Sequence, residues 1–153
     1  MQSIIIADTS CLIALSKINR IEILNEIFGK IYVTQIVAEE FKKKLPENFS
    51  IKNPSDISTE KLKGIKIDRG EASAIALALE EKNPLLIIDE KKGRIIAKHF
   101  GIRIMGTVGV LLEAKKDGLI ESLKTEIEKL QEHSRFRLSD ALIKEALKNA
   151  NEK

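Results

Sequence analysis

Short apolar runs alternate along the chain with longer segments in which apolar residues recur every three or four positions. Continuous apolar runs are typical of strands that are covered on both faces, and the longer spacing is typical of helices with one buried side. The runs predict strands at 4–7, 31–33, 85–88 and 102–105. The helical spacing predicts helices at 21–28, 34–45, 69–82, 90–100, 108–116, 119–130 and 139–147.

Segment 46–58 shows neither pattern and holds two of the three prolines, so we expect a loop there. Strand signals continue on both sides of it, which indicates an excursion within one domain. Strands that alternate with helices build βαβ units, and these place helices on both faces of a parallel sheet. We therefore predict a three-layer α/β/α fold in which residues 1–153 form a single domain and 119–153 form a C-terminal helical extension.

A chain of 153 residues with 43% hydrophobic and 32% charged residues fits one globular domain. Its single cysteine, Cys11, excludes an internal disulfide, and one cysteine with two distant histidines argues against a structural zinc site. No apolar run approaches the roughly 20 residues of a membrane helix, and the start of the chain lacks the pattern of a signal peptide. We expect a cytoplasmic protein with no membrane partner.

The net charge of +3 neither indicates nor excludes a nucleic-acid partner, but the basic residues are clustered. Most such clusters are solvated helix faces. One of them, Lys91, Lys92 and Arg94, directly follows Asp89, so its cations are candidates for contact with substrate phosphates. Arg69 is a further candidate for the same role.

Two aspartates directly follow predicted strands. Asp8 ends the run 4–7 and Asp89 ends the run 85–88, so both are expected at the carboxyl edge of the sheet, where functional groups of α/β proteins collect. If the two strands are neighbours, the Cα atoms of the aspartates lie roughly 5 Å apart. Each aspartate also precedes a helical segment, so helix capping is the alternative role of either residue.

Two glutamates on predicted helices complete a candidate cluster. In the helix 34–45, Glu40 lies on the flank of the apolar face whereas Glu39 points to solvent, so Glu40 is the candidate. Its alternative role is a surface pair with Lys44. Glu71 opens an alanine-rich helix and leans toward its buried side, and its alternative role is to compensate the helix dipole.

Four gathered carboxylates repel one another, and a hard divalent cation removes this repulsion. Because no histidine or cysteine belongs to the cluster, Mg²⁺ or Mn²⁺ fits it better than zinc does. Such an ion activates water and polarises phosphoryl oxygens. Ser10, and with less support Thr9, is a candidate to orient a carboxylate or hold a metal-bound water. The alternative role of Ser10 is to cap the helical segment that follows Asp8, the first along the chain.

These motifs resemble those of the PIN domain. The matching motifs are Asp8-Thr9-Ser10 after an apolar strand, Glu40 on its helix, Gly70-Glu71-Ala72 and Ile87-Ile88-Asp89. Segments 106–115 and 136–142 resemble a mostly archaeal and bacterial PIN-like subfamily. The resemblance covers most of the chain and implies a parallel sheet of about five strands and a metal-dependent ribonuclease.

The resemblance also implies roles and partners. It implies that five residues are catalytic: Asp8, Glu40, Glu71, Asp89 and Ser10. The four acids among them are also implied to be ligands of Mg²⁺ or Mn²⁺, directly or through water. It implies single-stranded RNA as substrate, a homodimer or higher oligomer and, for a VapC-type toxin, an antitoxin protein as partner. Glu71 stands where many PIN domains carry aspartate, and Glu90 is the one acid available directly after Asp89.

Two other interpretations stay open at this point. The sequence Gly106-Thr107-Val108-Gly109, between a predicted strand and a helix, suits a phosphate-binding loop, although a tight turn explains the same glycines. The second interpretation is a PIN-like module that binds RNA or a protein and cleaves weakly or not at all.

Overall fold

The computed structural model describes residues 3–152 and holds a five-stranded parallel sheet with the strand order β3-β2-β1-β4-β5. The strands are β1 Ile4–Ala7, β2 Ile31–Val33, β3 Phe49–Ile51, β4 Pro84–Ile87 and β5 Arg103–Met105. The strand order reverses between β1 and β4, so the crevice expected to hold the functional site lies beyond the carboxyl ends of these two neighbouring strands.

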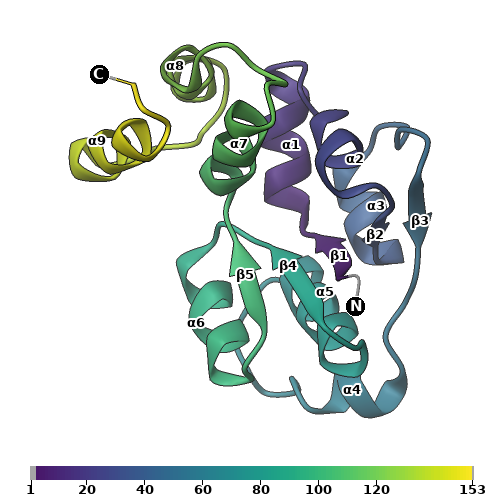
Figure 1. The fold of residues 1–153 in the computed structure, drawn as a ribbon. Helices are drawn as coiled ribbons and strands as arrows, with labels where there is room; N and C mark the ends of the chain where they lie inside the picture. The colour runs from purple at the N-terminus through teal and green to yellow at the C-terminus, as the bar shows by residue number, and fades with distance from the viewer. Residues whose placement is uncertain (1–2, 153) are drawn as a thin grey trace.

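Helices cover both faces of the sheet, which confirms the predicted three-layer α/β/α fold (Figure 1). The helices whose buried side chains join the first core cluster are α1 Thr9–Lys17, α2 Ile23–Phe28, α3 Gln35–Phe41, α7 Thr107–Lys116, α8 Leu123–His133 and α9 Asp140–Asn149. The opposite layer consists of α4 Asp56–Glu60, α5 Arg69–Glu80 and α6 Lys91–His99.

The side chains of the central strands alternate between the two core clusters, as the pleat of a strand requires. Toward the first cluster point Ile5, Ala7, Leu85 and Ile87, and toward the second point Ile6, Leu86 and Ile88. Ala7 pairs with Ile87 in the ladder. Continuing the alternation, Asp8 is directed to the same face as Ile6, and Asp89 to the same face as Ile87.

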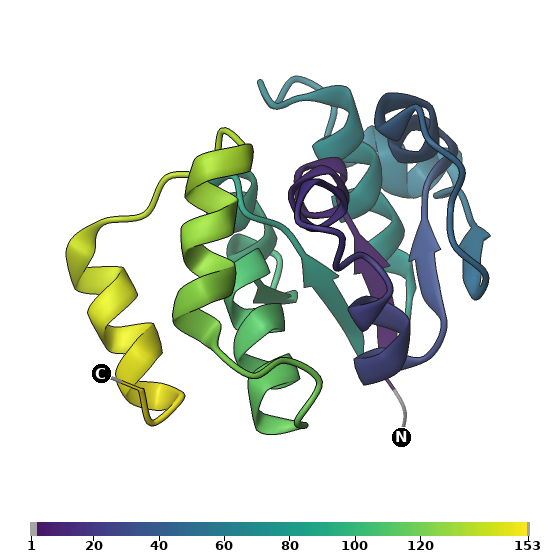
Figure 2. The ribbon, with the colours of Figure 1, turned by 90° about the horizontal axis from the view of Figure 1, so that it is seen from above.

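The C-terminal helices pack against the first helical layer. Ile127 and Leu130 of α8 and Leu147 of α9 are buried in the same cluster as Leu111 of α7. Figures 1 and 2 both show α8 and α9 beside α7, at the end of the molecule far from β3. The extension predicted at 119–153 thus continues the core and adds a wall on the β5 side.

The prediction of a loop over 46–58 was wrong in part, because β3 and the first residues of α4 lie within it. β3 is a short edge strand that pairs only with β2, and Ile51 is 47% exposed, so it lacks the apolar run of a central strand. The helix α4 begins after Ser55, whose hydroxyl accepts a hydrogen bond from the backbone N–H of Ser58.

Several predicted helix boundaries shift. The helix predicted at 34–45 ends at Phe41, because Lys42 adopts a left-handed conformation with φ of 62° that terminates the helix. The helix predicted from 21 begins at Ile23, and the tail helices span 123–133 and 140–149. These differences leave the layers and the strand ends unchanged.

Candidate functional site

Asp8 occupies the most buried position in the candidate site. It lies directly after β1 as the N-cap residue of α1, and 2% of its surface is exposed. Its side chain makes no capping bond, and its Oδ1 has no hydrogen-bond partner among the described residues. The capping alternative therefore does not explain this carboxylate.

The surroundings of Asp8 disfavour its charge. Burial raises the pKa of Asp8 from 3.8 to about 7; the backbone N–H of Thr9 opposes the rise, and the charges of Glu71 and Glu40 add to it. A buried carboxylate without a partner is costly unless a proton or a cation neutralises it. Asp8 is therefore poised to accept one or the other.

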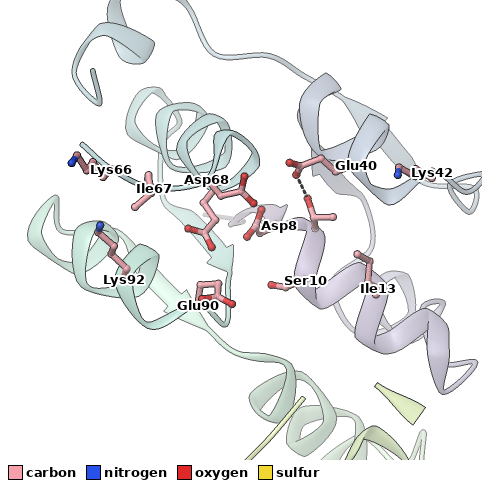
Figure 3. Close-up of a pocket in the computed structure, with 12 residues that line it drawn as sticks. Asp8, Ser10, Ile13, Glu40, Lys42, Lys66, Ile67, Asp68, Glu90 and Lys92 are labelled. Atoms are coloured by element: carbon pink, nitrogen blue, oxygen red, sulfur yellow. Dashed lines mark hydrogen bonds between the residues drawn. The ribbon is translucent and has the colours of Figure 1, made fainter. Parts of the chain in front are cut away.

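Asp8 lines a pocket of about 640 Å³ at the carboxyl edge of the sheet, and we call this the acidic pocket (Figure 3). Its acidic residues come from the end of β1, from α3, from the start of α5 and from the junction before α6. They are Asp8, Glu40, Asp68, Glu71 and Glu90. The cations of its lining are Lys42, Lys66 and Lys92. The sheet topology thus brings acids together that lie up to 82 positions apart in the chain.

Glu40 enters the acidic pocket from α3. The hydroxyl of Thr9 donates a hydrogen bond to its Oε1 at 2.7 Å, so Thr9 orients a carboxylate, the role for which Ser10 had been favoured. Glu39 is exposed and accepts a hydrogen bond from Gln35, which confirms that Glu40 and not Glu39 lies on the inner flank. The pair with Lys44 that was the alternative for Glu40 is not among the ion pairs of the described residues.

Gly70 makes room for the carboxylate of Glu40. A Cβ atom at this position would lie 2.0 Å from Oε1 and 2.9 Å from Cδ of Glu40. Such contacts are far inside van der Waals distance, so any larger residue at position 70 must displace Glu40. The glycine in the motif Gly70-Glu71-Ala72 therefore leaves the space that the carboxylate of Glu40 occupies.

We expect Gly70→Ala to displace Glu40 from Thr9 and, for the metal-dependent nuclease that the sequence predicts, to lower activity about 10- to 100-fold, the usual effect of disturbing a metal site's supporting residues. The fold should persist, because the atom displaced is the end of a flexible side chain and alanine favours a helix by about 1 kcal/mol over glycine. Activity and melting temperature would be measured for Gly70→Ala, Glu40→Ala and the double variant. If the two substitutions lower activity independently, the displacement of Glu40 is not the cause.

Glu71 lies in the first turn of α5 and is buried, with 7% of its surface exposed. The pKa of Glu71 is raised from 4.5 to about 7, mainly by burial and in addition by the charges of Glu90, Asp68 and Glu40. A carboxylate that served only the dipole of α5 would gain from being charged. The raised pKa indicates that burial and the neighbouring acids, rather than the helix dipole, dominate the environment of Glu71.

Asp68 is a pocket acid that the sequence reasoning missed. It is the N-cap residue of α5 without a side-chain capping bond, and its charge raises the pKa of both Asp8 and Glu71. The signal that could have revealed it is its spacing from Glu71, since residues three apart share one side of a first helical turn. Glu90, named above only as the acid after Asp89, also lines the pocket.

Asp89 does not line the acidic pocket. It lies at an adjoining hollow, where its Oδ1 accepts a hydrogen bond of 2.8 Å from the backbone N–H of Thr107 and its Oδ2 accepts one from the hydroxyl of Thr107. Burial raises the pKa of Asp89, while these bonds and the charge of Arg94 oppose the rise. The strand alternation that directs Asp8 to one face of the sheet and Asp89 to the other explains the separation.

The carboxylate of Asp89 already occupies the N-terminus of α7. A phosphate-binding loop at Gly106-Thr107-Val108-Gly109 would need the same backbone N–H group for its ligand. A Cβ atom on Gly106 would lie 2.9 Å from Oδ1 of Asp89 and 2.8 Å from Nη1 of Arg94. Gly106 is therefore explained by the close approach of protein side chains, as expected for a tight turn.

We expect Asp89→Ala to lower the free energy of unfolding by about 1–2 kcal/mol, because it removes the acceptor for the first turn of α7. Asp89→Asn keeps an acceptor oxygen and should cost less. Urea denaturation measures both, with Thr107→Val as the variant that loses the hydroxyl bond alone. Equal stability of Asp89→Ala and the wild type would show that this contact does not hold α7 in place.

The remaining predicted residues divide between the two hollows. Ser10 lines both of them, and its buried Oγ has no hydrogen-bond partner among the described residues. The N-cap of α1 is Asp8, so Ser10 does not cap that helix. Lys92 lines the acidic pocket, and Lys91 and Arg94 line the adjoining hollow. Arg69 is exposed and lines neither.

A family model described as a PIN domain matches residues 4–152. The chain belongs to the PIN-domain family. This family has a nuclease-type fold, and its members are generally nucleases that typically use divalent metals. No curated protein and no solved structure matches the chain.

The donors of this PIN domain suit a hard divalent cation. All pocket acids offer carboxylate oxygens, and the unpartnered Oδ1 of Asp8 is the atom with most to gain from an ion. Among residues 3–152, no three Asp, Glu, His or Cys side chains already stand close enough together to hold one ion. Mg²⁺ commonly binds through one or two carboxylates and retains several waters. Such a site does not require three side chains to lie close to the same ion.

None of the helices in residues 3–152 is both long and apolar enough to cross a bilayer.

Proposed function

We propose that this PIN domain is an endoribonuclease that hydrolyses RNA phosphodiester bonds with the help of Mg²⁺ or Mn²⁺. The observation that carries the proposal is the buried carboxylate of Asp8, whose Oδ1 has no hydrogen-bond partner within residues 3–152 and which lines a pocket with four further acids. Membership in a family of nucleases supports the same reaction class.

The acidic side chains of the pocket are assigned to the metal ion. Asp8, Glu40 and Glu71 would hold the ion directly or through water, with Asp68 and Glu90 beside them. When bound, the ion supplies Lewis-acid activation of water and of the phosphoryl group. Thr9 holds Glu40 in place through its hydrogen bond.

The other pocket residues are assigned to the substrate. Lys92 lines the pocket and would contact a substrate phosphate, which brings cationic charge to an otherwise acidic site. The hydroxyl of Ser10 offers a polar atom for a water molecule. Asp89, the fourth acid predicted from the sequence, lies on the other face of the sheet. It would contribute by holding the first turn of α7 in position.

The proposal is tested with purified protein and a labelled single-stranded RNA. We expect cleavage with Mn²⁺ or Mg²⁺, none with a chelator, and none with either ion when the pocket acids are substituted. Because contaminating ribonuclease is the usual error, wild type and variants must be purified identically. Binding of RNA without cleavage under every metal would overturn the nuclease proposal in favour of a non-catalytic binding module.

The cellular role that we propose is that of a VapC-type toxin, which the resemblance to PIN toxins supports. Such a toxin would act as a homodimer or higher oligomer and would be neutralised by an antitoxin protein encoded beside it. Expression should arrest growth, and coexpression of the neighbouring gene should restore it. Growth that is unaffected by an active nuclease would exclude the toxin role while leaving the chemistry intact.

A further inference from the structure

A second hollow of about 1080 Å³, which we call the side groove, adjoins the acidic pocket. Its walls come from α1, the start of α6, α7, the segment 134–138 and α9. The two C-terminal elements belong to the helical extension, to which no function has been assigned above. The side groove therefore shows where that extension faces the candidate active site.

The charged residues of the side groove favour an anionic ligand. Its basic side chains are Lys17, Lys91, Arg94, Arg135 and Arg137, and its acidic side chains are Asp89, Glu90 and Glu145. Both oxygens of Asp89 accept hydrogen bonds from Thr107, so this carboxylate already has hydrogen-bond partners within the protein. Positive charge thus prevails along the groove, in contrast to the acidic pocket beside it.

The lining of the side groove is also partly apolar. It includes Ile13, which is 37% exposed, together with Met105, Val108, Leu112 and Phe136. Cations and apolar side chains in one groove match the two parts of a single-stranded nucleic acid, whose phosphates bind cations and whose bases pack on apolar side chains.

The side groove and the acidic pocket adjoin each other. Ser10, Ile13 and Glu90 line both hollows, so a ligand in the side groove lies directly beside the acidic pocket. The shape of the groove on the extension side depends on Arg137, whose Nη1 donates hydrogen bonds to the carbonyl oxygens of Gln131, Ser134 and Phe136 at 2.9, 3.1 and 2.8 Å. Arg137 therefore organises the wall, whereas the exposed Arg135 beside it is available to a ligand.

We propose that the side groove binds the part of a single-stranded RNA that flanks the cleaved bond, with Arg135 of the C-terminal extension and Lys17 of α1 contacting its phosphates. The proposal rests on the proposed nuclease function for the identity of the substrate. It gives the extension a task that the acidic pocket cannot perform, which is to supply cationic contacts away from the site of cleavage.

The test measures binding of a fluorescent single-stranded RNA by anisotropy in a chelator, so that cleavage plays no part. The double variant Lys17→Glu, Arg135→Glu should bind at least about tenfold more weakly than wild type, and its salt slope should fall by roughly 0.7 for each lost phosphate contact. The matched control is Lys82→Glu. Lys82 is exposed and precedes the first residue of β4, so it lies at the amino ends of the strands, opposite to the carboxyl ends. The control variant should bind RNA as the wild type does.

Substrate length gives an independent measurement. An oligonucleotide of about ten nucleotides fills both hollows and should lose affinity in the double variant, whereas a dinucleotide should be insensitive to it. Equal affinity and salt slope for wild type and double variant would overturn the proposal, as would binding of a peptide in place of RNA at the groove. RNA binding that depends on the groove, without cleavage under any metal, would uphold the groove and reject the nuclease function.

Discussion

Replacing Asp8 with asparagine is expected to abolish metal-dependent RNA cleavage while the fold persists. The substitution keeps the shape of the side chain but removes the charge of the carboxylate whose Oδ1 has no hydrogen-bond partner in the described part of the chain. Changes to residues that merely support metal ligands already cost about 10- to 100-fold, so loss of a direct ligand should cost at least about 100-fold. Cleavage rates of a labelled RNA at saturating Mn²⁺ measure the effect.

A matched substitution separates this effect from a general loss of acidic charge. Asp117 is an exposed C-cap residue of α7, so Asp117→Asn makes the same chemical change outside both hollows and should leave the cleavage rate unchanged. Circular dichroism would establish that Asp8→Asn is folded. A folded Asp8→Asn that still cleaves RNA at the wild-type rate would remove the basis of the proposed mechanism.

The metal-free protein should become less stable as the pH rises from about 4 to beyond 7. The pKa values of Asp8 and Glu71 are raised to about 7 in the folded protein, from 3.8 and 4.5. The folded state therefore binds protons that the unfolded state has released, so these groups stabilise it fully below their unfolded pKa values and lose that contribution as the pH passes the folded ones. One pKa unit corresponds to about 1.4 kcal/mol, so the deeply buried Asp8 contributes on the order of a few kcal/mol, and Glu71, which is less deeply buried, contributes less.

Urea denaturation at several pH values, with and without Mn²⁺, measures this dependence. Glu71→Gln cannot ionise, so its stability relative to wild type should increase between pH 4 and pH 8 in the absence of metal. Mn²⁺ should stabilise the wild type most at high pH, where the acids are charged, and should stabilise Asp8→Asn much less. A stability difference between wild type and Glu71→Gln that does not vary with pH would contradict the raised pKa.

The local pattern of the sequence predicted most of the fold and several parts of the site. Continuous apolar runs predicted the central strands, because a strand covered on both faces has no polar side. The position of Asp8 at the end of such a run placed it at the carboxyl edge. The helical spacing separated Glu40 from Glu39, because the direction of a side chain on a helix depends on local geometry alone.

Only the tertiary structure decided which acids meet. Asp8 and Asp89 follow neighbouring strands, one and two residues after their ends, and strand alternation directs them to opposite faces. This information lies in the pairing of β1 with β4 rather than in either segment. The same holds for Gly70, which is required by a carboxylate 30 positions away in the chain.

The sequence by itself thus determined the layers of the protein and the edge of the sheet at which its acids gather. The reason is that the spacing of apolar residues shows which faces of each strand and helix are buried. The tertiary structure decided the membership of the acidic pocket, adding Asp68 and Glu90 and placing Asp89 outside it. It also joined segment 134–138 to α1 and α6 in one groove. These outcomes depend on distances between elements remote in sequence, which only the packing of the whole chain fixes.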